Sequence, residues 1–354
     1  MKNLIYSINI YIHMVFPFSR FLVDPKFSQV LDDLSNKNIH ASKFSSYEPD
    51  YTNIAKDYEN ESKVSFIDKY GTLDLDPKLG QKAVESLTIC AYDESLSKIS
   101  ALEGSGFFVS HGLVLMEKEQ YLPLTYLTFD FYTKSQTIAD GNNSLSFTNE
   151  PPEIASKKKY IKDREMILSS YIPDNTILLV DGPLIGSQMT EHNLQLVESL
   201  LKRDIFPLFF VKNSDSSLIV DNISTLKNKF NSDFDWAYNS LKVGQISSFA
   251  KYIDLTDNSG RRNKIFAYMK AFDAAPIRIE MHDTVYAKLQ SKLNTILSLI
   301  YYLLLAQGNL TNPQPRPIAI SEKYAREALR VINLERIIKQ TGIKPTMNFT
   351  RFGW

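Results

Sequence analysis

The chain has 354 residues, 44% of them hydrophobic and 23% charged, which is ordinary for a soluble globular protein of one large domain or two modest ones. Its 40 basic and 40 acidic residues cancel, so the total charge gives no sign of a polyanionic partner, although a local basic groove would not show in the total. A single cysteine, Cys90, excludes an internal disulfide framework and any cysteine-based zinc cluster, and it indicates a reducing, cytoplasmic compartment.

Two apolar stretches resemble targeting or membrane segments without meeting the requirements for either. Residues 4–18 follow a single basic residue, Lys2, and no small-residue cleavage site comes after them, so we expect no signal peptide. Met14 is an alternative start. Residues 293–306 are fewer than the ~20 that a membrane span needs, so we expect a buried helix there and no membrane contact.

Residues from about 20 to 100 are polar, rich in Asp, Lys and Ser, and weakly periodic. This composition predicts helices and loops. A clearer alternation of strands and helices begins near Ile99. We therefore divide the chain into an N-terminal extension, residues 1–98, and a mixed α/β domain, residues 99–354. The extension either docks a partner or completes the fold of the domain.

In the second part of the chain, apolar periodicity predicts strands and helices in turn. Residues 106–116 suggest two paired strands joined at His111-Gly112, and residues 139–152, rich in Asn, Ser, Gly and Pro, indicate a loop. The remaining expected elements are a half-buried strand at 121–132, a charged helix at 156–170, a buried strand at 176–180, an amphipathic helix at 191–202, a buried strand at 205–211, and long helices at about 283–307 and 321–340. Strand, helix and strand of these lengths imply a right-handed parallel crossover.

Asp181 stands at the carboxyl end of the buried strand TILLV, and Gly182 and Pro183 form the turn that follows. Ligands and catalytic groups in open α/β sheets gather at this edge, so Asp181 is the first candidate for chemistry. The alternative is a turn aspartate that caps the next segment.

Glu165 lies on the preceding helix, in the segment KDREMIL. A helix that packs back onto its following strand can bring Glu165 near Asp181, and two close carboxylates in an apolar setting repel each other unless a cation accompanies them. The alternative is a surface glutamate paired with Lys162 or Arg164.

Glu103 is the third candidate, because it precedes a Gly-Ser-Gly turn that permits close approach of backbone or ligand. A plain tight turn is the alternative, and Asp68 is a rival because it also ends a short apolar run. Three carboxylates without His or Cys favour a hard cation such as Mg²⁺ or Mn²⁺. Such a cation can generate hydroxide and stabilise the leaving oxygen in phosphodiester hydrolysis.

Basic residues near this edge are candidate phosphate ligands. Lys212 follows the strand IFPLFFV and either neutralises a phosphate or is solvated. Arg278, in APIRIEM, either contacts DNA or forms an ion pair with Glu280. The basic runs at 157–159 and 261–262 are phosphate contacts or solvated loops, and we favour the solvated state.

The order of these segments resembles the NurA family: Glu-Gly-Ser, a helical Arg-Glu, LLVDGPL, a strand ending in Lys, and PIRIE, over about residues 100–330. The resemblance implies an RNase H-like core with a mixed central sheet flanked by helices. It also implies hydrolysis of DNA ends, in repair and end resection, that depends on Mn²⁺ or Mg²⁺. A homodimer and a HerA-type hexameric ATPase are the implied partners.

Three acidic positions of the family are matched in this sequence. Glu103 stands at the first acidic motif, which is usually Asp-Gly-Ser, and it is preferred to Asp68 because its interval to Glu165 is closer to the family's interval. Glu165 matches the acidic helix position, and Asp181 matches the second Asp-Gly motif.

The C-terminal motif departs from the family pattern. In QPRPIAISEKYA, Gln314 occupies a position that is usually Tyr, and Glu322 occupies one that is usually His. Glutamate can still ligate a metal or hold a water. Glu103 is longer than the usual Asp by one methylene, and active sites are sensitive to displacements of about 1 Å. These changes leave activity as the open question.

Two functions follow from the resemblance. In the first, the chain is an active nuclease with acidic metal ligands, a fourth acid, and groups that contact phosphate or DNA. These residues are, in that order, Glu103, Glu165 and Asp181, then Glu322, then Lys212, Arg278 and Gln314. In the second, the chain is a catalytically degenerate paralogue that binds DNA or the motor. An unrelated α/β protein without a nucleic-acid role is a third alternative.

Overall fold

The structure is a computed structural model, and it describes residues 49–53, 62–140, 145–186, 189–331 and 334–346. These residues belong to one compact unit. The expectations for residues 4–18, that they are no signal peptide and that Met14 is an alternative start, fall outside the described residues.

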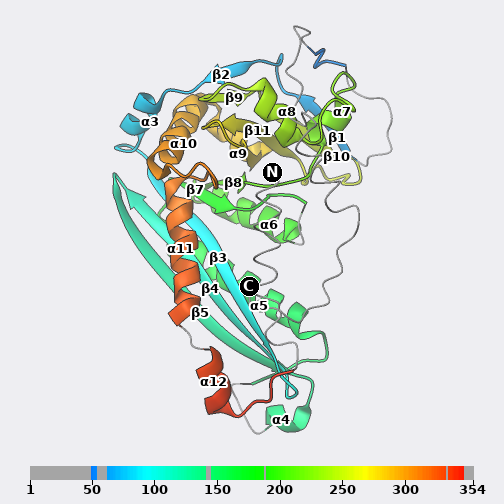
Figure 1. Ribbon diagram of the computed structural model, residues 1–354, viewed down its shortest axis with the longest axis vertical. Helices are drawn as coiled ribbons and strands as arrows, with labels where there is room; N and C mark the ends of the chain where they lie inside the picture. Colours follow the sequence, from blue (N-terminus) through cyan, green and yellow to red (C-terminus); the bar gives the residue numbers. More distant parts are fainter. Residues whose placement is uncertain (1–48, 54–61, 141–144, 187–188, 332–333, 347–354) are drawn as a thin grey trace, which may run out of the picture. The chain divides into compact units, whose positions relative to one another are not determined.

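A mixed sheet forms the centre of the fold (Figure 1). Three long strands, β3 (Thr88–Ser100), β4 (Ser105–Glu117) and β5 (Gln120–Thr133), form an antiparallel meander. β3 also pairs in parallel with β7 (Thr176–Asp181), which pairs in parallel with β8 (Phe206–Val211). The order β5-β4-β3-β7-β8, an antiparallel meander followed by parallel strands, is that of an RNase H-like core. The predicted fold class is therefore confirmed.

Shorter strands extend this core on both sides. Beyond β8 the sheet continues in the order β12-β11-β10-β1, all antiparallel, and β9 joins β11 to β2, while β6 pairs with β5 at the other edge. These strands are β1 (Ser62–Phe66), β2 (Thr72–Asp74), β6 (Ser146–Phe147), β9 (Gln245–Ser247), β10 (Ala250–Asp254), β11 (Lys264–Lys270) and β12 (Ile277–His282).

The hairpin predicted within residues 106–116 is wrong, because these residues belong to the single strand β4. Gly112 makes no turn there and pairs with Asp93 on β3 and Thr125 on β5. The absence of a side chain at Gly112 allows close packing against a helix. A Cβ at Gly112 would lie 2.4 Å from the carbonyl oxygen of Ser321 on helix α11 (Arg316–Val331). Glycine thus allows the helix to lie directly on the strand.

The segment 62–98, for which the sequence left two alternatives, supplies β1, β2, helix α3 (Pro77–Ala83) and most of β3. A boundary between residues 98 and 99 falls inside β3. Cys90 and Tyr92 on that strand have no exposed surface, so this part of the chain completes the core of the sheet.

Helices cover both faces of the meander (Figure 1). Gly112 and its neighbour Asp93 face α11, whereas Tyr92 faces helix α5, whose Arg164 lies 5.2 Å from the centre of the Tyr92 ring. Successive residues of a strand point to opposite faces, so α5 and α11 lie on opposite sides of β3. Within the described residues the helices, besides α3, are α4 (Gln136–Asp140), α5 (Pro152–Ser170), α6 (Thr190–Leu201), α7 (Leu218–Asn222), α8 (Asp233–Ser240), α9 (Asp283–Leu289), α10 (Leu293–Gln307), α11 and α12 (Leu334–Thr341).

Most predicted helices are confirmed, with changes at their ends. The expected helices at 156–170 and 191–202 are α5 and α6, and α6 joins the parallel strands β7 and β8. The long helix expected at 321–340 corresponds to α11 and α12, which stand on either side of residues 332–333, outside the described residues.

One helical segment among the described residues, Asp283–Gln307, is long and apolar enough to cross a membrane, judged by length and composition alone. Half of its apolar window is buried within the structure. The segment has the bounds of the long helix expected at about 283–307, and within it α9 and a short 3-10 turn lead directly into α10. Leu299, Ile300 and Leu304 of α10 are almost completely buried. The predicted buried helix is therefore confirmed.

Candidate metal centre

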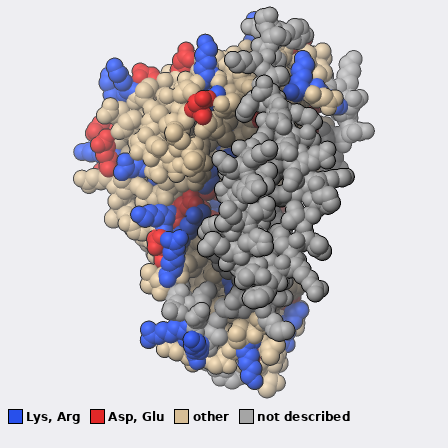
Figure 2. Space-filling model, viewed as in Figure 1, with Lys and Arg blue, Asp and Glu red and all other residues tan. Residues whose placement is uncertain are grey.

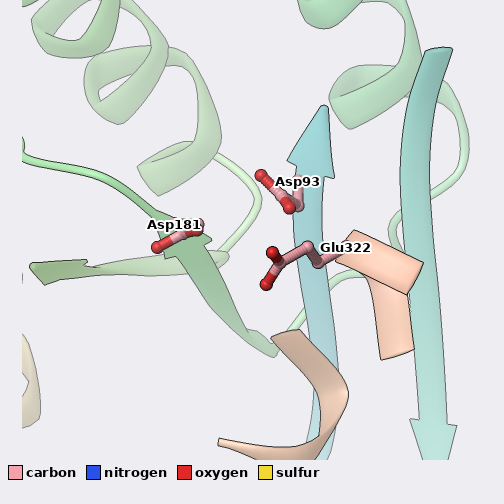
Figure 3. Close-up of side chains that lie close together, drawn as sticks. All are labelled: Asp93, Asp181 and Glu322. Atoms are coloured by element: carbon pink, nitrogen blue, oxygen red, sulfur yellow. The ribbon is translucent and has the colours of Figure 1, made fainter. Parts of the chain in front are cut away.

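Three carboxylates from distant parts of the chain converge at one edge of the sheet (Figure 3). Asp93 on β3, Asp181 at the end of β7 and Glu322 on α11 each offer one oxygen, and these oxygens all lie within 4.8 Å of one another. In the described part of the chain, no other group of three His, Cys, Asp or Glu side chains has this spacing. We call these three residues the acidic cluster. Its all-oxygen ligand set suits a hard divalent cation.

Strand register places the two aspartates together. Tyr92 on β3 pairs with Val180 on β7 in the parallel ladder. The next residues along the two strands, Asp93 and Asp181, therefore leave the ladder side by side. β7 ends at Asp181 while β3 runs on to Ser100, so both aspartates lie where the parallel pairing stops. Ligand groups in α/β sheets gather at such carboxyl ends.

The glutamate comes from the helix that lies over the meander. Glu322 follows Ser321, whose carbonyl oxygen packs on Gly112, and Gly112 is the cross-strand neighbour of Asp93. The close approach of helix and strand at this glycine thus brings Glu322 over Asp93. A residue with a side chain at position 112 would push them apart.

The acidic cluster is short of positive charge around Asp93. Burial raises the pKa of Asp93 to about 7, and the negative charges of Asp181 and Glu94 act in the same direction. Burial and these acidic neighbours therefore disfavour the charged form of this carboxyl, and Lys212 offsets them only in part. A divalent cation would reverse that preference, so the electrostatics of the cluster fit a metal ion.

Lys212 and Gln314, both predicted near this edge, lie against the cluster. Nζ of Lys212 lies 2.7 Å from Oδ2 of Asp181 and 3.5 Å from Oε2 of Glu322, and it donates to Oε1 of Gln314 at 2.8 Å. Nε2 of Gln314 donates to Oε2 of Glu322 at 2.9 Å. Burial would raise the pKa of Glu322, but Gln314, Lys212 and the ion-paired Arg326 together hold it below its ordinary value.

Glu103 does not join Asp181, contrary to the prediction. It lies in the turn between β3 and β4, and Asp93 is separated from that turn by the strand up to Ser100, on the order of 20 Å of extended chain. Oε2 of Glu103 accepts a hydrogen bond from the backbone N–H of Lys344 at 3.0 Å. The alternative of a plain tight turn fits this position. Its rival Asp68 is exposed just after β1.

Glu165 also lies outside the acidic cluster as defined by its 4.8 Å spacing. Its side chain is 46% exposed, and Oε1 lies 3.4 Å from Nδ1 of the buried His192 on α6. The adjacent Arg164 is buried and donates to Asn193. Of the three residues predicted to converge, the structure places Asp181 alone in the cluster.

The sequence contained a signal for Asp93 that the prediction did not use. The segment TICAYD at 88–93 has the same form as TILLVD at 176–181: a threonine, four apolar or aromatic residues, and an aspartate. Residues 93–95 also read Asp-Glu-Ser, close to the Asp-Gly-Ser of the first acidic motif. This segment was overlooked because the polar stretch on its N-terminal side made the whole region look like an extension.

Arg278, predicted to contact DNA or to pair with Glu280, is buried and forms the ion pair, with Nε 2.9 Å from Oε1 of Glu280. Its NH1 group donates to Oγ of Ser216 and to the hydroxyl of Tyr268. A DNA contact would require these hydrogen bonds to break, so the structure favours the ion pair with Glu280 over a phosphate contact by Arg278.

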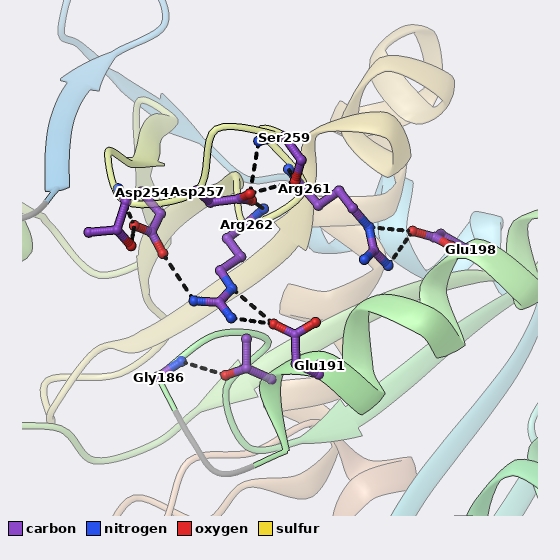
Figure 4. Close-up of polar contacts among 10 residues, drawn as sticks. Gly186, Glu191, Glu198, Asp254, Asp257, Ser259, Arg261 and Arg262 are labelled. Carbon is purple, nitrogen blue, oxygen red and sulfur yellow. Dashed lines mark hydrogen bonds and ion pairs between the residues drawn. The ribbon is translucent and has the colours of Figure 1, made fainter.

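The exposed basic runs are paired with acids. Arg261 and Arg262 bind Glu198 and Glu191 on α6 (Figure 4). Lys158 binds Glu150, and Lys159 binds Asp163. On the face shown in Figure 2, Lys and Arg lie beside Asp and Glu over the upper and middle described surface, whereas the lower end shows Lys and Arg without visible Asp or Glu.

Several solved structures are similar to this chain. The chain is similar to the NurA nuclease from Sulfolobus solfataricus, with 12% identity over 77% of this chain and 86% of that one and a TM-score of 0.48. It is also similar to Ciona intestinalis endonuclease V in complex with an inosine-containing DNA, with 12% identity, coverage of 73% and 97%, and a TM-score of 0.35. A NurA structure with manganese matches at 13% identity, coverage of 62% and 56%, and a TM-score of 0.19. Curated proteins give no match.

The model of the NurA domain family matches residues 88–332. This match spans more than half of the chain and includes the three residues of the acidic cluster together with Lys212 and Gln314. The chain belongs to the NurA family of nucleases.

Proposed function

We propose that this protein is a metal-dependent nuclease that hydrolyses phosphodiester bonds of DNA, with its cation held by Asp93, Asp181 and Glu322. The observation that carries the proposal is the convergence of three carboxylate oxygens within 4.8 Å at the edge of an RNase H-like sheet. The raised pKa of Asp93 supports it, because a buried carboxyl among like charges is stabilised by a cation.

Residues around the acidic cluster have separate roles at this site. When bound, a divalent cation supplies Lewis acidity toward water and phosphate oxygens. Lys212 lies against Asp181 and Glu322 and is placed to neutralise charge on a phosphate. Gln314 orients both Lys212 and Glu322 through its two amide atoms. Glu165 stays a candidate acid on the strength of its position in the family motif, whereas Glu103 does not.

Family membership supports the finer parts of the proposal. DNA ends as substrate, manganese as the preferred ion and a HerA-type hexameric ATPase as partner are the expected properties of this family. We extend them to this chain, together with a homodimer and a cytoplasmic location. Magnesium is the alternative ion, because both cations take carboxylate oxygens.

A second candidate function is a catalytically degenerate paralogue that binds DNA or the motor. It is favoured by one observation: the Lys212 ammonium contacts Asp181, Glu322 and Gln314 and so balances part of the negative charge without a metal.

Digestion of end-labelled DNA in the presence of Mn²⁺ distinguishes these functions. The wild type and Glu103→Gln are expected to cut DNA, whereas Asp181→Asn is expected to lose at least roughly 100-fold in rate, more than outer-shell changes cost. Cutting that survives Asp181→Asn would rule out the proposed site. No cutting by the wild type with any divalent metal, with or without the motor, would favour the degenerate paralogue.

A further inference from the structure

Hydrogen bonds at several backbone atoms hold the loop that follows Asp181. The N–H of Gly182 donates to the carbonyl oxygen of Phe210 on β8, and Gly182 has φ of +100°, a conformation that L side chains rarely adopt. Nδ2 of Asn193 donates to the carbonyl oxygens of Pro183 and Leu184. These contacts leave the Leu184 N–H as the next backbone donor of the loop.

That donor binds a carboxylate from another part of the sheet. The N–H of Leu184, a residue with no exposed surface, donates to Oε2 of Glu280 at 2.9 Å. Glu280 lies on β12 and is itself completely buried. Its other oxygen, Oε1, accepts from Nζ of Lys264 at 2.6 Å and lies 2.9 Å from Nε of Arg278.

A buried ionic group of this kind is a poor source of stability. Removing charges from water costs several kcal/mol per ion, and buried ion pairs can often be replaced by apolar residues of similar volume. Burial would raise the pKa of Glu280, yet Lys264 and Arg278 hold it below its ordinary value, so the carboxylate stays charged. The two cations thus keep an ionised acceptor ready for the Leu184 N–H.

We infer that Glu280 is a positioning residue for the acidic cluster: by holding the Leu184 N–H, it fixes the loop that sets the direction of the Asp181 carboxylate. This inference rests on the proposed function. Outer-shell groups that orient a ligand typically change metal affinity roughly 10–100-fold when they are removed. Glu280 acts through the loop and touches neither the substrate nor the ion.

Asp233 on α8 offers a matched control. It too is completely buried, and Oδ2 accepts from the hydroxyl of Tyr268, the residue to which Arg278 also donates. Its other oxygen, however, accepts the N–H groups of Ile219 and Val220 at α7 and not any group of the Asp181 loop. Asp233→Asn therefore disturbs the same buried network without releasing the loop.

The test measures Mn²⁺ affinity by the electron paramagnetic resonance of free Mn²⁺. Two double variants, Lys264→Met with Glu280→Gln and Lys264→Met with Glu280→Leu, carry the same net charge. They differ in whether position 280 keeps an acceptor oxygen. The Gln variant and Asp233→Asn are expected to bind Mn²⁺ within about threefold of wild type. The Leu variant is expected to bind roughly 10–100-fold more weakly.

Equal affinity in the Gln and Leu variants would overturn the positioning role, as would an equal loss in Asp233→Asn. If the Leu variant does not fold, hydrogen exchange on the wild type decides. The Leu184 amide is expected to exchange as slowly as the amides of β7, and rapid exchange would overturn the role. A wild-type chain that binds no Mn²⁺ would instead overturn the proposed function, and this inference with it.

Discussion

Two clusters of charged side chains lie against the same sheet, and they differ in how their charges balance. The acidic cluster of Asp93, Asp181 and Glu322 has two bases against its three carboxylates: Lys212 contacts Asp181 and Glu322, and the exposed Arg326 contacts Glu322. The second, which we call the balanced cluster, has two acids and two bases: Asp233, Glu280, Lys264 and Arg278. All four of its side chains are buried.

The difference shows what each cluster is for. In the balanced cluster every carboxylate oxygen accepts a hydrogen bond or faces a base, so the group is complete in itself. In the acidic cluster three carboxylates face two bases, Lys212 and Arg326, so the negative charges outnumber the positive ones. A group that lacks a cation is a place for a ligand, whereas a complete group holds structure.

The largest expected effect concerns activity. Asp93→Asn removes one proposed metal ligand while nearly preserving its shape, and we expect the Mn²⁺-dependent nuclease rate to fall at least roughly 100-fold. The rate of release of labelled nucleotides measures it. Glu103→Gln is the control, because Glu103 lies at the far turn and should leave the rate unchanged. An Asp93→Asn chain that cuts at the wild-type rate would place the site elsewhere.

The balanced cluster should respond to charge removal through stability. Arg278→Met leaves Glu280 and Asp233 with one base fewer in a buried setting, and we expect unfolding to become easier by about 3–5 kcal/mol. Urea unfolding followed by circular dichroism measures this change. Lys158→Met, at an exposed pair with Glu150, should change the stability by less than about 1 kcal/mol. Similar losses in the two variants would contradict the assignment of a buried, complete cluster.

In the metal-free chain, stability should depend on pH through Asp93. Its folded-state pKa of about 7 lies above its ordinary value of 3.8, so the folded state binds the proton more tightly. The stabilisation that comes from proton binding at Asp93 is fully present below about pH 4 and is lost as the pH rises through about 7. The free energy of unfolding falls by at most about 1.4 kcal/mol per pH unit on this account.

Urea unfolding in EDTA between pH 5 and pH 8 tests this dependence. Asp93→Asn should lose less stability over that range than the wild type, and Mn²⁺ should remove the difference by stabilising the charged carboxylate. Parallel pH profiles of the two chains in EDTA would show that Asp93 does not make stability depend on pH in this way.

The smallest effect concerns His192, beside Glu165. Burial, with the nearby Arg164, lowers the pKa of His192 to about 4 from an ordinary 6.5. The folded state therefore favours the neutral ring, and stability is retained above about pH 6.5 and lost as the pH falls toward 4. Melting temperatures at pH 7.5 and 5.5 should show a smaller acid loss in His192→Gln than in the wild type. An equal loss would assign the acid sensitivity to other groups.

The sequence predicted the parts of the site that local pattern determines. A buried strand followed by Asp-Gly indicated Asp181, and the strand before Lys212 indicated that lysine. The family resemblance indicated Gln314 and Glu322, and the structure places both against Asp181 through Lys212. The RNase H-like fold was likewise predicted from the resemblance.

What the sequence did not reveal depends on register and on packing between distant segments. The pairing of Tyr92 with Val180 brings Asp93 beside Asp181, and no local pattern states that register. Gly112 was read as a turn, although its use is to admit α11 close to β4. Glu103 was predicted because a Gly-Ser-Gly turn follows it. The turn is present, but it lies beyond the end of β3 and far along the strand from Asp93.

The most direct test of the central claim is anomalous diffraction from a crystal of the chain soaked in Mn²⁺. We expect a Mn²⁺ peak within ligand distance of Asp93, Asp181 and Glu322, at roughly 2.0–2.6 Å from carboxylate oxygens. A peak at Glu103, or the absence of a peak at the acidic cluster under conditions in which the crystal takes up Mn²⁺ elsewhere, would contradict the account.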